Sequence, residues 1–243
     1  MLRLLHAAML TLVVLGSPAA AATAQAPAVS QDPAFALAER VAPAEIMLPL
    51  EMKIGKQAFY MGFEADAEGK ALLEEYPNLP DVLWAAVEPE LVRYSAADHP
   101  KFLDRLAALY RARLTTREMA GLYEFYGSST GRKLVREAYR GLDANPVLAD
   151  LAKQEGDVSA ESLQAARGAG LSNVVSSLDA ADEAALLGIG KILPLEKWRQ
   201  IGAETQKLTL EWVNQEDPVL EARIEALIEA AFEKYLAGKD GAG

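Results

Sequence analysis

The sequence predicts an all-α fold, a multi-helix array of amphipathic helical hairpins. Three observations predict it. Apolar residues recur with helical spacing along most of the chain, no alternating run of β-branched residues marks a strand, and Ser, Thr or Asp repeatedly stands where a helix would start. The helices should therefore pack through their apolar stripes.

Prolines divide the first half of the chain. Asp32 followed by Pro33 forms a cap and a first-turn proline, so a helix should begin there. Pro89 should kink or split a helix that opens at Pro80, and Pro100 should separate that helix from the next. The helices expected after the first run over residues 50–63, 67–76, 80–91 and 101–113.

The middle of the chain carries the densest local signals. Thr115 can cap a helix, and Glu118 can reach back to the Thr115 backbone N–H, which together form a capping box. Gly127 should end this helix, because glycine tolerates the left-handed conformation of a helix end. Ser128 or Ser129 can then cap a second helix. The segment therefore predicts a helical hairpin with a tight polar elbow.

Five further helix starts follow in the second half, the first at the cap and first-turn pair Asn145-Pro146. Ser159 and Asp179 can each cap a helix. Pro194 can open a long one, and the last helix should begin at Asp217-Pro218 and end at Gly238. On that last helix a glutamate recurs every fourth residue, which predicts a solvated acidic face; these are Glu221, Glu225, Glu229 and Glu233.

A weak internal repeat links two parts of the chain at an offset of 64 residues. Either a duplication or the general likeness of any two amphipathic hairpins explains it. The corresponding residues are Leu114, Glu118, Leu122, Phe125 and Leu134 in the first copy and Leu178, Asp182, Leu186, Ile189 and Trp198 in the second.

The N-terminus has the pattern of a cleaved signal peptide. Arg3 supplies a positive start, residues 7–15 are apolar, and cleavage after Ala24 fits the small-x-small rule, with Ala22 and Ala26 as alternatives. The apolar run is shorter than the roughly 20 residues of a membrane span, so we expect export to the periplasm rather than a retained anchor. The expected divisions are a signal peptide at 1–24, a flexible leader at 25–32, a helical domain at 33–238 and a disordered tail at 239–243.

Composition limits the chemistry. The chain has no cysteine, which excludes disulfides, thiolate metal sites and a cysteine nucleophile. The formal charge of −11 becomes −12 when residues 1–24 and their one charge, Arg3, are removed, and this argues against a nucleic-acid partner. His99 is then the one remaining histidine, expected in a surface loop, and no calcium-loop spacing is present. We therefore expect no metal and no cofactor, and no transmembrane segment in the mature chain.

Charge is unevenly spread along the chain. Residues 101–140 hold nine basic and four acidic side chains, a net charge of +5, while the rest of the mature chain is −17. One interpretation is a basic patch for an anionic partner such as lipid headgroups, a cell-wall polymer or an acidic protein. The other is pairing with acidic C-terminal helices of the same domain. The candidate binding residues are Arg113, Arg117, Arg132, Lys133 and Arg136.

The hairpin resembles a known bacterial pattern, Phe-Tyr-x-Ser-x-x-Gly preceded by a Thr-x-x-Glu helix start. The matching residues are Thr115, Glu118, Phe125, Tyr126, Ser128 and Gly131. The pattern is similar to the core of the exported family named domain of unknown function twenty fifty-nine, here covering about 101–142. The resemblance implies a signal-bearing, helical, periplasmic protein, and it implies no catalytic residue.

The elbow at residues 127–131 also fits Gly-x-Ser-x-Gly, the nucleophile elbow of serine hydrolases, with Ser129 as the nucleophile. That elbow needs a strand before the serine and a histidine base nearby. Here a capped helix precedes the serine, and His99 lies upstream beside a proline. A helix–turn–helix corner explains the same residues, with glycine giving backbone freedom and serine capping.

Together these features predict a non-catalytic binding or interaction module of the cell envelope. Its partner would be an envelope macromolecule or an anionic surface. Two alternatives stand beside this interpretation: a serine-dependent hydrolase that uses Ser129, and a self-associating structural helical protein.

Overall fold

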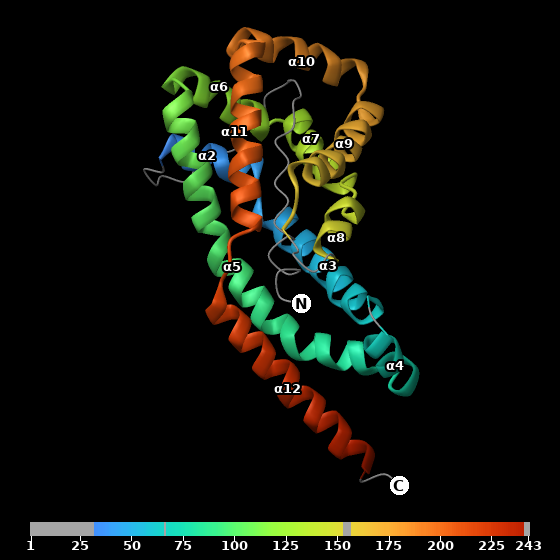
Figure 1. Cartoon of the computed structure of the whole chain (residues 1–243). Coiled ribbons are helices and arrows are strands. Elements are labelled where there is room, and N and C mark those ends of the chain that lie inside the picture. The colour runs from blue at the N-terminus through green and yellow to red at the C-terminus, as the bar shows by residue number, and fades with distance from the viewer. Residues whose placement is uncertain (1–31, 66, 153–156, 241–243) are drawn as a thin grey trace.

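The computed structural model describes residues 32–65, 67–152 and 157–240. All regular secondary structure among these residues is helical, so the predicted all-α class is confirmed (Figure 1). The expected signal peptide, the leader up to residue 31 and residues 241–243 of the expected tail lie outside the described residues.

The helices follow one another with short connections, as hairpins do. In chain order they are α2 (Pro33–Val41), α3 (Ala44–Glu64), α4 (Ala67–Glu75), α5 (Leu79–Arg113), α6 (Thr116–Gly127), α7 (Ser129–Arg140), α8 (Asn145–Leu151), α9 (Ala160–Ser177), α10 (Ala180–Ile192), α11 (Leu195–Val213) and α12 (Pro218–Asp240).

Side-chain caps fix most of the helix starts at the expected residues. The Asp32 carboxylate accepts from the backbone N–H of Ala34 at 3.1 Å. The hydroxyl of Ser159 accepts from the backbone N–H of Ser162 at 3.1 Å, and the carboxylate of Asp217 accepts from the N–H of Leu220 at 3.0 Å. Each cap satisfies an N–H group that has no partner inside its own helix.

The long helix α5 corrects the boundary expected at Pro100. It runs unbroken for 35 residues, with both Pro89 and Pro100 inside it. An interior proline costs about 3 kcal/mol and removes a helix hydrogen bond, so tertiary packing must hold the helix together. Figure 1 shows α5 changing direction along its length, as the kink expected from Pro89 allows. The last helix likewise continues past Gly238 to Asp240.

Two hydrophobic cores share α5. The larger core joins α2 and α3 to helices α6 to α11 and uses the C-terminal half of α5, including Phe102, Leu106 and Tyr110. The smaller core uses the N-terminal half of α5 with Phe59 of α3 and two residues of α12; its buried members are Phe59, Leu79, Leu83, Trp84, Val87, Leu91, Leu220 and Ile224. Because both halves of α5 are anchored, the helix tolerates its prolines. Residues 33–100 therefore contribute to both cores: residues 34–58 to the larger one, and Phe59 with residues 79–91 to the smaller one.

The elbow between α6 and α7 is built differently from the left-handed glycine that the sequence predicts. Gly127 does end α6, but the break comes from Ser128, whose extended backbone has φ −72° and ψ 168°. The Ser128 hydroxyl then caps α7 by accepting from the backbone N–H of Gly131 at 3.0 Å. A Cβ on Gly131 would lie 2.1 Å from the carbonyl oxygen of Phe125. Gly131 is therefore required by the close approach of the two helices.

Candidate functional site

An apolar cleft of about 540 Å³ opens between α3, α4, α5 and α12. Its volume lies in the range of small-ligand sites, roughly 300–1,000 Å³. The lining residues are Phe59, Phe63, Leu72, Leu79, Leu83, Ile224, Glu225, Ile228, Glu229 and Phe232. Figure 1 shows these four helices at the lower end of the molecule, with α12 running along α5. The cleft is therefore assembled from parts of the chain that are far apart in sequence.

The floor and walls of the cleft come from helical spacing. Phe59 and Phe63 are one turn apart on α3, as are Leu79 and Leu83 on α5. Phe59, Leu79 and Leu83 are buried and form the floor. Phe63 is half-buried and packs its ring edge-on to Phe59, with centroids 5.4 Å apart. Phe63, which is partly exposed in the cleft wall, therefore packs directly on the buried floor.

Two contacts fix α12 as the remaining wall. Arg223 donates to the Glu90 carboxylate of α5 at 2.9 Å, near the start of α12. The guanidinium groups of Arg93 and then Arg223 hold the pKa of Glu90 well below its usual range, at about 2. Toward the other end of α12, Tyr235 packs edge-on to Tyr76, with ring centroids 5.9 Å apart. The wall is therefore anchored on both sides of the cleft.

The cleft has an acidic rim. Glu225 and Glu229, one turn apart on α12, line it and are exposed. In the part of the chain that the structure describes, neither carboxylate takes part in an ion pair. Glu225 and Glu229 belong to the four glutamates for which the sequence predicts a solvated face, and the structure places these two at the edge of the apolar cleft.

The candidate basic residues of the central hairpin are largely engaged within the chain. Arg113 of α5 forms an ion pair with Glu204 of α11, at 2.7 Å. Arg132 donates to the backbone carbonyl of Gly127, at the elbow. Of these two contacts, only that of Arg113 with Glu204 is of the kind that the pairing interpretation describes.

Arg117 and Arg136 remain exposed, on α6 and α7 respectively. Among the described residues, no ion pair or hydrogen bond engages either guanidinium. Arg117 and Arg136 are therefore available to an external anion. The binding role of the five candidate basic residues stays a prediction.

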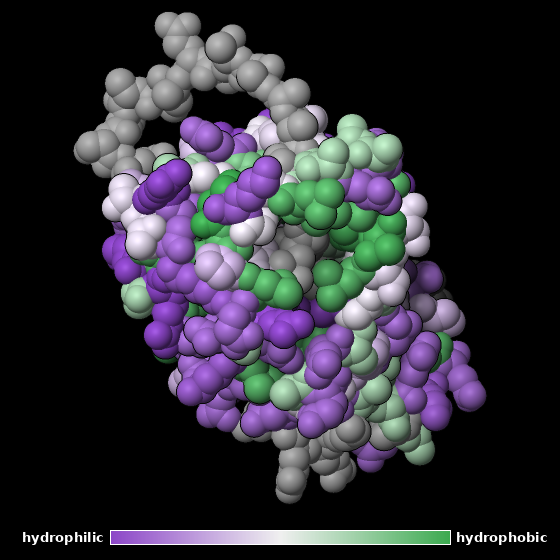
Figure 2. Space-filling view, turned by 90° about the horizontal axis from the view of Figure 1, so that it is seen from above, coloured by the Kyte–Doolittle hydropathy of each residue, from purple (hydrophilic) through white to green (hydrophobic). Residues whose placement is uncertain are grey.

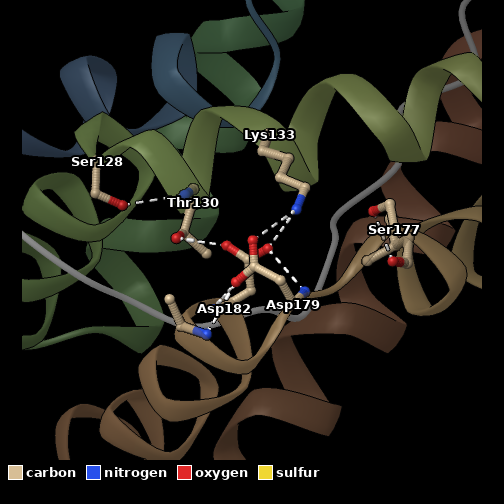
Figure 3. A network of polar contacts seen from close by, with 9 residues as sticks. Ser128, Thr130, Lys133, Ser177, Asp179 and Asp182 are labelled. Carbon is tan, nitrogen blue, oxygen red and sulfur yellow. Dashed lines mark hydrogen bonds and ion pairs between the residues drawn. The ribbon is translucent and has the colours of Figure 1, made fainter.

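Lys133 is the centre of a polar network that ties α7 to α10 (Figure 3). Its ammonium pairs with Asp182 and lies 3.6 Å from Asp179. The hydroxyl of Thr130 donates to Asp182 at 2.7 Å. Burial would raise the pKa of Asp182, but the hydrogen bonds from Lys133 and Thr130 outweigh it and the pKa is lowered. Lys133 is therefore a structural cation rather than a free binding group.

Ser129 lies at the first turn of α7, exposed, and a helix rather than a strand precedes it. His99 is not in a surface loop, as expected, but inside α5 and only 4% exposed, because the helix continues through Pro100. Its ring N–H bonds the backbone carbonyl of Ala42, and burial lowers its pKa. No contact in the described part of the chain joins His99 to Ser129.

A buried polar layer lies between the two cores, where α3 meets α5. It contains Glu51 of α3 and Ser95, Asp98 and His99 of α5, each at most 7% exposed. Burial raises the pKa of the Glu51 carboxyl to about 8, the Ser95 hydroxyl opposes the shift and the Asp98 charge adds to it. Neither Glu51 oxygen makes a hydrogen bond of normal geometry within the described residues. Sequence reasoning missed Glu51, since a lone glutamate on an amphipathic helix is normally exposed.

A second apolar surface lies at the opposite end of the molecule. Figure 2, seen from above, shows hydrophobic side chains gathered on this end of the molecule. The helices at this end expose Val175 of α9 (68%), Leu187 of α10 (78%) and Leu195 of α11 (61%). None of the described helices is long and apolar enough to cross a bilayer. No group of three or more His, Asp or Glu side chains in the described ranges could hold a metal ion.

Comparison with known proteins places one part of the chain in context. Residues 100–140 match the model of a family described as "Uncharacterized protein conserved in bacteria (DUF2059)". This confirms the resemblance expected from the hairpin. No curated protein and no solved structure matches the chain. The matched residues cover the end of α5 with α6 and α7, and the cleft lies outside them.

Proposed function

We propose that this protein is a non-catalytic binding module of the bacterial cell envelope, and that the apolar cleft is its binding site. The observation that carries the proposal is the cleft itself. It offers about 540 Å³ lined by eight apolar side chains from four helices, with two unpaired carboxylates at its edge. A concave, mostly apolar site with a few convergent polar groups is the usual form of a binding site.

One feature of the chain supports the envelope as its location, and a second supports a bacterial source. The N-terminal pattern of Arg3, the apolar residues 7–15 and the small residues up to Ala24 is typical of an export signal. The match of residues 100–140 to a family conserved in bacteria agrees with a bacterial source. Fractionation of cells that produce the tagged protein tests the location: recovery of a shortened chain in the periplasm is expected, and a full-length cytoplasmic chain would contradict it.

The binding role can be tested with a neutral dye whose fluorescence rises in apolar surroundings. Ile228→Asn puts a polar group into the cleft wall and should abolish the fluorescence gain. Leu72→Gln puts a polar group into the cleft from α4 and should also abolish the fluorescence gain. It keeps the test valid if Ile228→Asn loosens α12. Val92→Asn is the matched control, because Val92 is 47% exposed on α5 and does not line the cleft. Equal dye binding by all four proteins would refute the cleft as a site.

A further inference from the structure

The shape of the cleft restricts what it can hold. Ile224, Ile228 and Phe232 follow one another at intervals of four along α12. At 1.5 Å per residue they span about 12 Å, or a little over two turns. An amphipathic helix that docks through residues i, i+4 and i+7 presents apolar side chains over about 10.5 Å. The cleft therefore has the length of a two-turn helix face.

The rim restricts the charge of the occupant. Glu225 and Glu229 border the apolar floor on the α12 side, exposed and without an ion-pair partner among the described residues. On the same helix, Arg223 is committed to Glu90 at 2.9 Å, and among the described residues Lys234 forms no ion pair with either carboxylate. An occupant with Lys or Arg beside its apolar face would supply the missing counter-charges.

A second copy of this chain is a poor occupant by the same argument. The whole chain carries a formal charge of −11, and its own apolar helix α12 carries glutamate at every fourth position from 221 to 233. Docking that helix into an acidic-rimmed cleft would place like charges together, which is unfavourable. The rim thus selects against self-association through this surface.

We propose that the cleft binds an amphipathic helical segment of another protein whose apolar face is flanked by lysine or arginine. This inference rests on the proposed function, since it names the ligand class of the same cleft. Apolar anchors would fill the space between α3, α4, α5 and α12, and the basic side chains would pair with Glu225 and Glu229. The carboxylates would contribute specificity and association rate more than affinity.

The test compares two synthetic peptides of about 15 residues with the same leucine positions, one with flanking lysines and one with flanking glutamates. Binding is followed by fluorescence anisotropy at low and at high salt. The lysine peptide should bind, and the glutamate peptide should not. Because exposed ion pairs are worth up to about 1 kcal/mol each, Glu225→Gln with Glu229→Gln should weaken lysine-peptide binding by about three- to tenfold and reduce its salt dependence.

The matched control is Glu124→Gln with Glu211→Gln, which removes two exposed carboxylates from α6 and α11, away from the cleft. It should leave peptide binding unchanged. Equal binding of both peptides, or no effect of the rim variant, would overturn the charge-selected ligand while dye binding still supports the cleft. Tighter binding of a neutral acyl chain, or a dimer that blocks the peptide, would also overturn it. If the wild-type protein also fails to bind the neutral dye, the proposed function itself is refuted.

Discussion

Lys133 of α7 pairs with Asp182 of α10, and 64 residues further along the chain Lys197 of α11 pairs with Glu118 of α6, at 2.5 Å. Glu118 and Asp182 are themselves 64 residues apart, and each completes the capping box of its own helix. Each hairpin thus supplies a lysine to the capping box of the other. The duplication that the repeat indicates stays a prediction, but the corresponding residues have reciprocal roles.

The reciprocity makes a testable prediction about stability. Lys133→Met should leave the carboxylate of Asp182, whose side chain is 5% exposed, without its counter-charge. Lys197→Met should do the same to Glu118, whose side chain is 15% exposed. Each change should lower the free energy of unfolding by about 2 kcal/mol, measured by urea denaturation. Lys234→Met, on an exposed lysine of α12, should change it by less than about 0.5 kcal/mol. Equal effects of all three would show that the pairs add nothing.

The elbow glycine gives a second prediction. A Cβ at position 131 would lie 2.1 Å from the Phe125 carbonyl oxygen and 2.6 Å from the Tyr126 Cα, and backbone atoms cannot move aside cheaply. Gly131→Ala should therefore destabilise the protein by about 3 kcal/mol. Gly202→Ala is the matched control, since a Cβ there meets nothing within 4 Å inside α11, and it should stabilise by about 1 kcal/mol. Thermal melts of the two variants should therefore shift in opposite directions; a Gly131→Ala melt like that of wild type would disprove the close approach.

The sequence predicted the elements whose signals are local. Thr115 with Glu118, and Asp179 with Asp182, cap their helices because a cap depends on residues three apart. The prediction from sequence was wrong where tertiary packing determines the course of a helix or the burial of a side chain. The continuity of α5 through Pro100 depends on two cores that local patterns do not reveal, and so does the burial of His99.

The candidate site was beyond sequence reasoning for a similar reason. The apolar stripe of α12 was evident, with Ile224, Ile228 and Phe232 in it, but a stripe alone does not say how completely it is covered. Only the packing shows that Ile224 is buried while Ile228 and Phe232 stay half-exposed along the cleft. The charge excess of the hairpin was evident too, and Arg113 shows why it did not predict a free patch: its partner Glu204 is 91 residues away.

The two elbow serines should differ in effect. Ser128→Ala removes the hydroxyl that caps α7 and should cost about 1 kcal/mol of stability. Ser129→Ala alters an exposed hydroxyl in the first turn and should cost less than about 0.5 kcal/mol. Mass spectrometry after treatment with a fluorophosphonate should find no adduct on wild type. An adduct that disappears in Ser129→Ala would instead support the hydrolase alternative.

The buried carboxyl of Glu51 should make stability depend on pH. In the folded protein its pKa is raised from 4.5 to about 8, so the folded state keeps a proton that the unfolded chain releases. Stability should therefore fall as the pH rises from about 5 to about 8, by up to roughly 1.4 kcal/mol per pH unit for this one group. His99, whose pKa burial lowers, acts in the opposite direction near neutral pH, because there the unfolded chain binds the extra proton.

Glu51→Gln tests the contribution of the glutamate. His99, Asp98 and its partner Lys101 are present in both proteins, so the difference between the two stability profiles reports Glu51 together with its coupling to Asp98. The amide cannot ionise, and the variant should gain on the wild type progressively between pH 5 and pH 8, by about 3 kcal/mol at pH 7. Urea denaturation at half-unit pH intervals measures this difference. Parallel profiles would mean that Glu51 titrates at its ordinary pKa, and that the layer between α3 and α5 admits water.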